Sequence, residues 1–172
     1  MSAHLPSTES SFQIIRRTVE LPVSFESFTQ KFESTLGRYS PQMLYATTTE
    51  EEMKKTVADT VGSQPFGIFA VQDHGRLLGL AGRPSKVKQY VIGDPRLAVQ
   101  MTAHEIRAAL HAPVTMLVYE VDGAAKVDYF TAQSIFGQFG NAQVDKVAKE
   151  IDEKRVRLIE NLVAEISGAS AA

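Results

Sequence analysis

The chain has 172 residues, a formal net charge of −2, 44% hydrophobic residues and 22% charged residues. These values are typical of one soluble globular domain, and the near-neutral charge argues against nucleic acid or a membrane as a partner. Because the sequence contains no cysteine, disulfides, thiolate nucleophiles, cysteine-bound zinc and iron–sulfur clusters are excluded. We therefore expect a domain that carries no cofactor.

Both ends of the sequence are polar and lack periodicity. Residues 1–11 and 167–172 are predicted to be disordered tails around a single domain at residues 12–166. The start has no apolar segment of the kind found in signal peptides. No apolar run approaches the roughly 20 residues that span a bilayer. We therefore expect a cytoplasmic protein.

A strand and a helix begin the predicted domain. Residues 12–21 are rich in β-forming residues and predict a strand that ends at Pro22. Ser24 then precedes phenylalanines at helical spacing, and Gly37 follows them, which predicts a helix that Ser24 caps.

The next segment, residues 38–63, leaves two interpretations open. Thr49 and Glu52 form a capping-box pattern, and only a thin apolar stripe follows it. The helix that begins here is therefore mostly exposed. It is either a lid over a pocket or a surface helix that covers no pocket.

Strands and helices alternate through the second half of the chain. Residues 76–82 fit a helical turn or a strand, and Pro95 favours a helix over residues 96–104. Asp122-Gly123 is a hairpin signal. The predicted strands and remaining helices are residues 66–72, 88–92, 114–121, 124–130, 132–139 and 142–166. This order indicates an α+β fold, with a mainly antiparallel sheet and helices on one face.

Several short motifs occur in a characteristic order: Asp73-His74, Ala81-Gly82, residues 90–95 with Gly93-Asp94-Pro95, Pro113, residues 117–120, Asp122-Gly123 and Asp128-Tyr129. This set resembles the family called domain of unknown function 302, over residues 12–166 and most closely over residues 66–129. The resemblance implies a curved sheet crossed by a long helix, as in the TATA-box-binding-protein-like α+β fold, and a homodimer. It implies neither DNA binding nor any particular activity. Segment 38–63 is longer than the usual link of the family between its first helix and second strand. Gly75 follows His74 at a position where many members of the family continue a helix.

Asp73 and His74 directly follow a buried strand, where a rigid scaffold commonly holds catalytic groups. Asp73 would orient the imidazole of His74 as a general base. In the alternative, Asp73 caps the following turn and His74 packs in a polar niche. Glu120 or Tyr129 would supply the acid, although a strand glutamate commonly faces outward and a strand tyrosine commonly packs.

A basic stretch runs from Arg76 to Arg96. In one interpretation it binds a carboxylate or phosphate group, with Tyr90 offering a hydroxyl. In the other it is a solvated loop whose charges keep an edge strand from pairing. Its members are Arg76, Arg83, Lys86, Lys88 and Arg96. His104, Glu105 and His111 lack zinc-site spacing, so we expect no metal.

Three functional hypotheses follow. The first is a module that binds a small, anionic metabolite between sheet and helices through Arg76, Arg83, Lys88 and Tyr90. The second is a cofactor-independent isomerase, lyase or hydrolase that uses His74, Asp73, Glu120 and Tyr129 on a small metabolite. The third is a homodimeric structural protein without a ligand.

Overall fold

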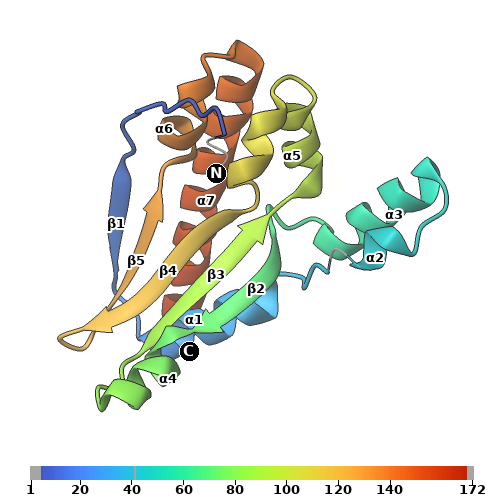
Figure 1. Cartoon of the computed structure of the whole chain (residues 1–172). Helices are drawn as coiled ribbons and strands as arrows, with labels where there is room; N and C mark the ends of the chain where they lie inside the picture. Colours follow the sequence, from blue (N-terminus) through green and yellow to red (C-terminus); the bar gives the residue numbers. More distant parts are fainter. Residues whose placement is uncertain (1–4, 41, 170–172) are drawn as a thin grey trace.

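One antiparallel sheet organises the computed structural model, which describes residues 5–40 and 42–169 (Figure 1). The strands lie in the order β1-β5-β4-β3-β2, and every neighbouring pair is antiparallel. Their bounds are β1 (Arg16–Leu21), β2 (Gly67–Asp73), β3 (Val87–Gly93), β4 (Val114–Val121) and β5 (Ala124–Phe130). The predicted α+β class is thus confirmed.

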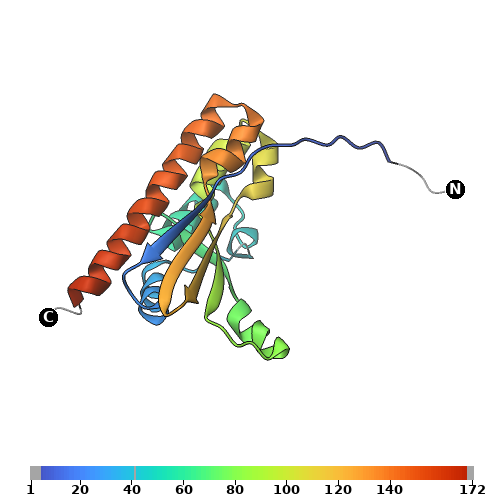
Figure 2. The same cartoon turned by 90° about the vertical axis from the view of Figure 1, so that its left-hand side faces the viewer.

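Helices cover one face of this sheet, and α1 and α7 lie across it (Figures 1 and 2). The α-helices are α1 (Phe25–Thr35), α2 (Gln42–Tyr45), α3 (Glu50–Val61), α4 (His74–Leu78), α5 (Pro95–Thr102), α6 (Ala132–Phe136) and α7 (Ala142–Ala169). Short 3₁₀ turns are η1 (Gly79–Ala81), η2 (Ile106–His111) and η3 (Gly137–Phe139). Burial of apolar side chains between sheet and helices supplies the main stabilisation. This core includes Phe28, Phe32, Tyr90, Ile92, Met116, Val118, Val127, Phe136, Leu158 and Leu162.

The helix N-caps that the sequence predicts are present in the structure. The side chain of Ser24 accepts a hydrogen bond from the Ser27 amide at 3.1 Å and starts α1. Thr49 and Glu52 make a complete capping box at the start of α3. These contacts satisfy amides that have no partner within their own helix, which is why the signals are reliable.

The inserted helix α3 is attached beside the β2 edge. Gly37 and Tyr39 exchange backbone hydrogen bonds with Ile68 of β2, both 2.8 Å long. A side chain on Gly37 would collide with the carbonyl oxygen of Thr60, so glycine permits α3 to approach. Figure 1 shows α3 standing to one side of the sheet, and only Val57 and Val61 of this helix are buried.

Several boundaries differ from the sequence-based expectation. β1 begins at Arg16 instead of residue 12, because Arg16 pairs with Phe130 at the very end of β5. α7 continues past residue 166 to Ala169. For segment 76–82, the structure has the helical alternative, in α4 and η1 up to Ala81. Of the predicted tails, residues 1–4 and 170–172 lie outside the described residues.

A fully buried arginine links α7 to the sheet. The Arg155 guanidinium lies 4.4 Å from the ring centroid of Tyr129 and donates to the Phe130 carbonyl at 3.0 Å. Asp152, 4.0 Å from Arg155, accepts from the amides of Ala132 and Gln133 at 2.8 and 3.0 Å. One carboxylate therefore caps α6 and balances a buried charge, although burial still lowers the pKa of Arg155.

We expect Asp152→Ala to lower the free energy of unfolding by about 3 kcal/mol, because it removes the negative charge beside the buried Arg155 and the acceptor of two amides. Urea unfolding followed by circular dichroism measures this loss. Glu153→Ala, on the exposed side of the same helix turn, is the control and should change stability by less than about 0.5 kcal/mol. Equal effects of the two substitutions would contradict the role given to Asp152.

Candidate functional site

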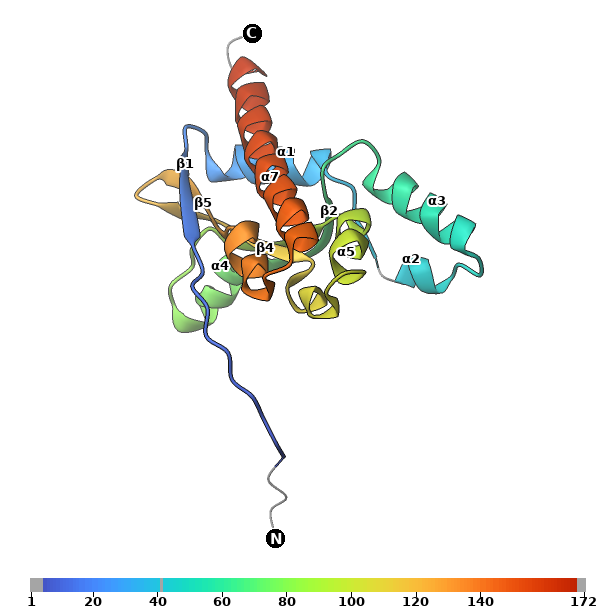
Figure 3. The same ribbon diagram turned by 90° about the horizontal axis from the view of Figure 1, so that it is seen from above.

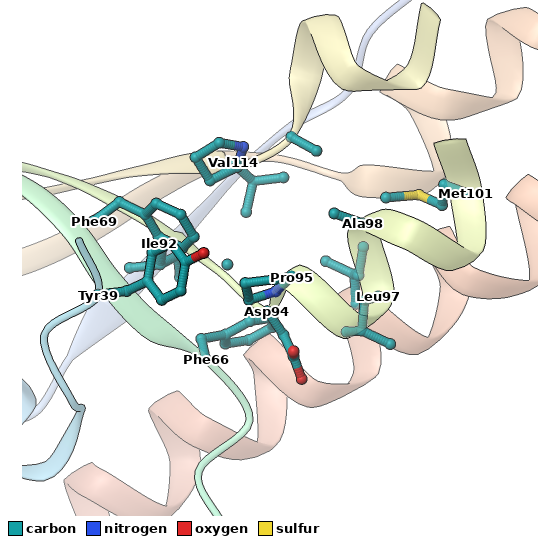
Figure 4. Close-up of a pocket in the computed structure, with 14 residues that line it drawn as sticks. Tyr39, Phe66, Phe69, Ile92, Asp94, Pro95, Leu97, Ala98, Met101 and Val114 are labelled. Atoms are coloured by element: carbon teal, nitrogen blue, oxygen red, sulfur yellow. The ribbon is translucent and has the colours of Figure 1, made fainter. Parts of the chain in front are cut away.

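A pocket of about 200 Å³ opens at the end of the sheet where β2 begins and β3 ends (Figure 4). Residues from distant parts of the chain form its walls, and nearly all of them are apolar. They are Tyr39, Phe66, Phe69, Ile92, Gly93, Asp94, Pro95, Leu97, Ala98, Met101, Ala112, Pro113, Val114 and Ile151. Small-molecule sites combine such apolar walls with a few placed polar groups.

The turn Gly93-Asp94-Pro95 sets the direction of α5 above the pocket. Asp94 accepts from the Arg96 amide at 2.9 Å as N-cap of α5, and Pro95 occupies the first turn of the helix. The same carboxylate holds the Arg96 guanidinium at 2.8–3.0 Å. Leu97, Ala98 and Met101 consequently face the pocket (Figure 4).

Gly93, at the end of β3, permits a close approach to Pro113 in the wall of the pocket. A Cβ atom there would lie 3.0 Å from Cβ of Pro113 and 3.4 Å from the Phe69 ring. Contacts of 3.0 Å are tighter than carbon atoms normally make, so a larger residue would push Pro113 outward. The glycine and proline motifs of the sequence thus meet in three dimensions.

Phe69 reaches the pocket through a β-bulge. The register between β2 and β3 shifts between Ile68 and Ala70, so Phe69 has no directly paired partner. Bulges re-aim side chains in this way, often beside functional sites. The Phe69 ring packs on Tyr39 with centroids 4.3 Å apart.

Tyr39 provides the polar group of the pocket that remains available. Its hydroxyl points into the space between Ile92 and Pro95 (Figure 4), and no described residue hydrogen bonds to it. Burial, with a smaller contribution from Tyr45, raises the pKa of Tyr39. The hydroxyl is therefore protonated at neutral pH and can donate to a ligand.

The residues predicted to be catalytic lie elsewhere. Asp73 pairs with Lys88, at the opposite end of β2 from Gly67 and the pocket. Its carboxylate accepts from the Arg76 amide at 2.8 Å and caps α4, while His74 begins that helix and is half-buried. Arg76 and Arg83 are exposed at the same end of the sheet.

Glu120 and Tyr129 do not join Asp73 and His74 in one cavity. Glu120 forms a 2.9 Å ion pair with Lys86, which also contacts Glu26. Tyr129 lies in the core under the Arg155 guanidinium. The catalytic roles of these residues remain predictions.

Two of the predicted ligand-binding residues, Lys88 and Tyr90, contact the same side chain, that of Glu33. Nothing in the sequence indicates Glu33 as a site residue. Oxygen Oε1 of Glu33 lies 2.8 Å from Lys88 Nζ and accepts from the Tyr90 hydroxyl at 2.8 Å. Arg38 approaches the second oxygen of Glu33 at 3.2 Å. The positive charge of Lys88 is thus already neutralised by Glu33 of α1.

Within residues 5–40 and 42–169, no three histidine, aspartate or glutamate side chains are grouped so that they could hold a metal ion. In the same ranges, no helix is long and apolar enough to cross a membrane.

The Glu33 network makes stability depend on pH. Burial raises the pKa of Glu33, but hydrogen bonds from Lys88 and Tyr90, with the charges of Lys88 and Arg38, outweigh it, so the pKa is lowered from its usual 4.5. A lowered carboxylate pKa stabilises the fold above the unfolded pKa, and this stabilisation disappears as pH falls through the folded pKa.

We expect Glu33→Gln to be destabilising at pH 7 and much less so at pH 3. Urea unfolding at both pH values tests this, with Glu160→Gln as the exposed control.

The fold and this pocket together define an α+β domain with one antiparallel sheet, helices on one face and a small apolar site at the sheet end. The family model described as "Domain of unknown function DUF302" matches residues 44–162, so the chain belongs to this family. A similar solved structure is the crystal structure of uncharacterized conserved protein DUF302 from Bacillus stearothermophilus, with a TM-score of 0.59 and 12% sequence identity. The match covers 87% of this chain and 95% of that one, and it shows the fold alone. No curated protein matches the chain.

Proposed function

We propose that this domain binds a small, mainly apolar molecule in the pocket of Figure 4. The observation that carries the proposal is an apolar pocket into which one available hydroxyl, that of Tyr39, points. Such a site gains affinity from burial of apolar surface and orientation from one hydrogen bond.

The pocket volume limits the size of the ligand. A dry apolar cavity of about 150 Å³ accommodates benzene, whereas drug-sized ligands occupy about 300–1,000 Å³. At about 200 Å³, this pocket suits one ring or a short branched chain. Because the pocket is partly open, a longer ligand can extend a tail into solvent.

The charges around the pocket favour a neutral ligand over the anionic one expected from the basic stretch. The Asp94 carboxylate lines the pocket, and Arg96 already neutralises it. Arg76, Arg83 and Lys88 belong to the other end of the sheet, and Lys88 is bound to Glu33. A ligand with one hydroxyl or carbonyl oxygen beside an apolar body matches this environment.

An acid–base enzyme centred on His74 has less support. Asp73 is occupied as the α4 cap and Glu120 is held by Lys86, so neither carboxylate faces His74 across a pocket. General acid–base chemistry requires such groups within hydrogen-bond reach of one substrate.

Methyl-resolved NMR tests the binding proposal with phenol and toluene as probes. We expect millimolar concentrations of either probe to shift the methyl signals of the pocket residues Ile92, Leu97, Met101, Val114 and Ile151. Ala98→Phe should abolish these shifts by filling the pocket. Val99→Phe, on the exposed side of α5, should leave them intact. Failure of both probes to shift these signals, or equal shifts in Ala98→Phe, would contradict the proposal.

Removal of the Tyr39 hydroxyl tests whether this group binds and orients the ligand by a hydrogen bond, or whether affinity comes from apolar burial alone. We expect Tyr39→Phe to weaken phenol binding about fivefold, the value of one net hydrogen bond of about 1 kcal/mol. Toluene binding should stay within about twofold, since toluene offers no partner for the hydroxyl. Titration of the same methyl signals gives both dissociation constants.

A further inference from the structure

A second hollow, here named the β1 cleft, lies beside the outer strand of the sheet and shares no residue with the pocket of Figure 4. Its volume is about 580 Å³, and it is enclosed by the start of β1, the start of α6 and the middle of α7. Figures 1 and 3 show α6 between β1 and α7. Metabolite-sized sites occupy about 300–1,000 Å³, so the volume suits a small molecule. The lining residues are Ile15, Arg17, Thr131, Gln133, Ser134, Asp152, Glu153, Val156 and Arg157.

Strand register directs Arg17 toward the β1 cleft and Arg16 away from it. Arg17 pairs with Tyr129, whose ring is buried in the core, so the Arg17 side chain is on the face of the sheet that α7 covers. Arg16 pairs with Phe130 on the opposite face, where it lies 3.6 Å from Asp128. No described residue forms a hydrogen bond or an ion pair with Arg17. Its guanidinium is therefore available to a ligand.

Hydrogen bonds fix the wall of the β1 cleft that α6 provides. The Ile15 amide donates to the Ser134 hydroxyl, and the Thr131 amide donates to the Ile15 carbonyl, both at 2.9 Å. The side-chain amide of Gln133 has no hydrogen-bond partner among the described residues and can donate to a ligand. Ile15 and Val156 give the cleft its apolar surface. The cleft thus combines an apolar wall with free hydrogen-bond donors.

A buried positive charge lies behind the β1 cleft. Arg155 is fully buried, and its Nε and Nη2 atoms form no hydrogen bond within the described residues. Burial lowers the pKa of Arg155, and the nearby charge of Arg17 lowers it further, against opposing contributions from Asp152 and Tyr129. The two arginines therefore repel each other. An anion beside Arg17 is attracted by both of them.

The carboxylates that line the β1 cleft are already paired. Glu153 lies 3.8 Å from Arg157 and 3.9 Å from Lys149. Asp152 accepts two backbone amides of α6 at 2.8 and 3.0 Å. The positive charge of Arg17 has no such counterpart, so the cleft favours a negative ligand.

We propose that the β1 cleft binds a small organic anion, independently of any ligand in the pocket of Figure 4. The carboxylate or phosphate group of this anion lies against the guanidinium groups of Arg17 and Arg157, whose paired N–H donors match both groups. The apolar body of the anion packs on Ile15 and Val156, and Gln133 donates to a remaining oxygen. In the basic stretch, by contrast, Lys86 and Lys88 have carboxylate partners.

Methyl-resolved NMR of the full chain separates this site from the other pocket, because Ile15 and Val156 line the β1 cleft alone. We expect millimolar benzoate and phenyl phosphate to shift the methyl signals of both residues. Benzyl alcohol, the neutral counterpart of benzoate, should leave them in place. Raising the salt concentration from about 0.02 to about 0.2 M should weaken anion binding several-fold by screening. Failure of both anions to shift these signals, or equal shifts with benzyl alcohol, would overturn the proposal.

Two neighbouring arginines provide a matched pair of variants. We expect Arg17→Gln to raise the dissociation constant of benzoate about tenfold, the value of one hydrogen bond to a charged group. Arg16→Gln changes the same chemistry on the opposite face and should stay within about twofold. Neither variant should unfold the protein, since both side chains are exposed.

Removal of a negative charge from the β1 cleft should have the opposite effect. We expect Glu153→Gln to lower the dissociation constant of benzoate about threefold. Equal weakening by the two arginine variants, or weaker binding by Glu153→Gln, would contradict the assignment of the anion to this cleft. Inorganic phosphate that binds as tightly as phenyl phosphate would contradict the role given to Ile15 and Val156.

Discussion

The alternation of side chains along the five strands is the constraint on which the rest of this structure depends. One set of positions enters the core beneath α1 and α7, and no helix within the described residues lies across the other set (Figure 2). The pocket lies where core positions meet the sheet end.

Features with local causes could be predicted from the sequence. Ser24, Thr49 and the Asp122-Gly123 turn act within a few residues of themselves, so the helices and the hairpin that they define are present. The long α7 follows from its apolar spacing. The start of β1 could not be predicted, because it depends on where β5 ends. Strand limits are set by the partner, which a single segment does not contain.

The pocket could not be predicted because its walls come from segments that are distant in sequence. Gly93 and Pro113 were notable as motifs, but nothing local indicates that they touch each other and Phe69. The bulge at Phe69 has no sequence signature beyond an ordinary apolar strand. The prediction favoured charged residues instead, and the structure uses Asp73 as a cap and Lys88 and Glu120 in ion pairs. A charge that already has its partner gains less from a ligand than an available hydroxyl does.

The likeness at 12% identity shows that this fold persists when almost every side chain differs. What must persist is a pattern: apolar residues at alternate strand positions, caps at helix starts and small residues at close approaches. None of these requirements determines which groups line the pocket. The ligand must therefore be inferred from the side chains that line the pocket, the Tyr39 hydroxyl and the Phe69 ring among them, and not from the fold.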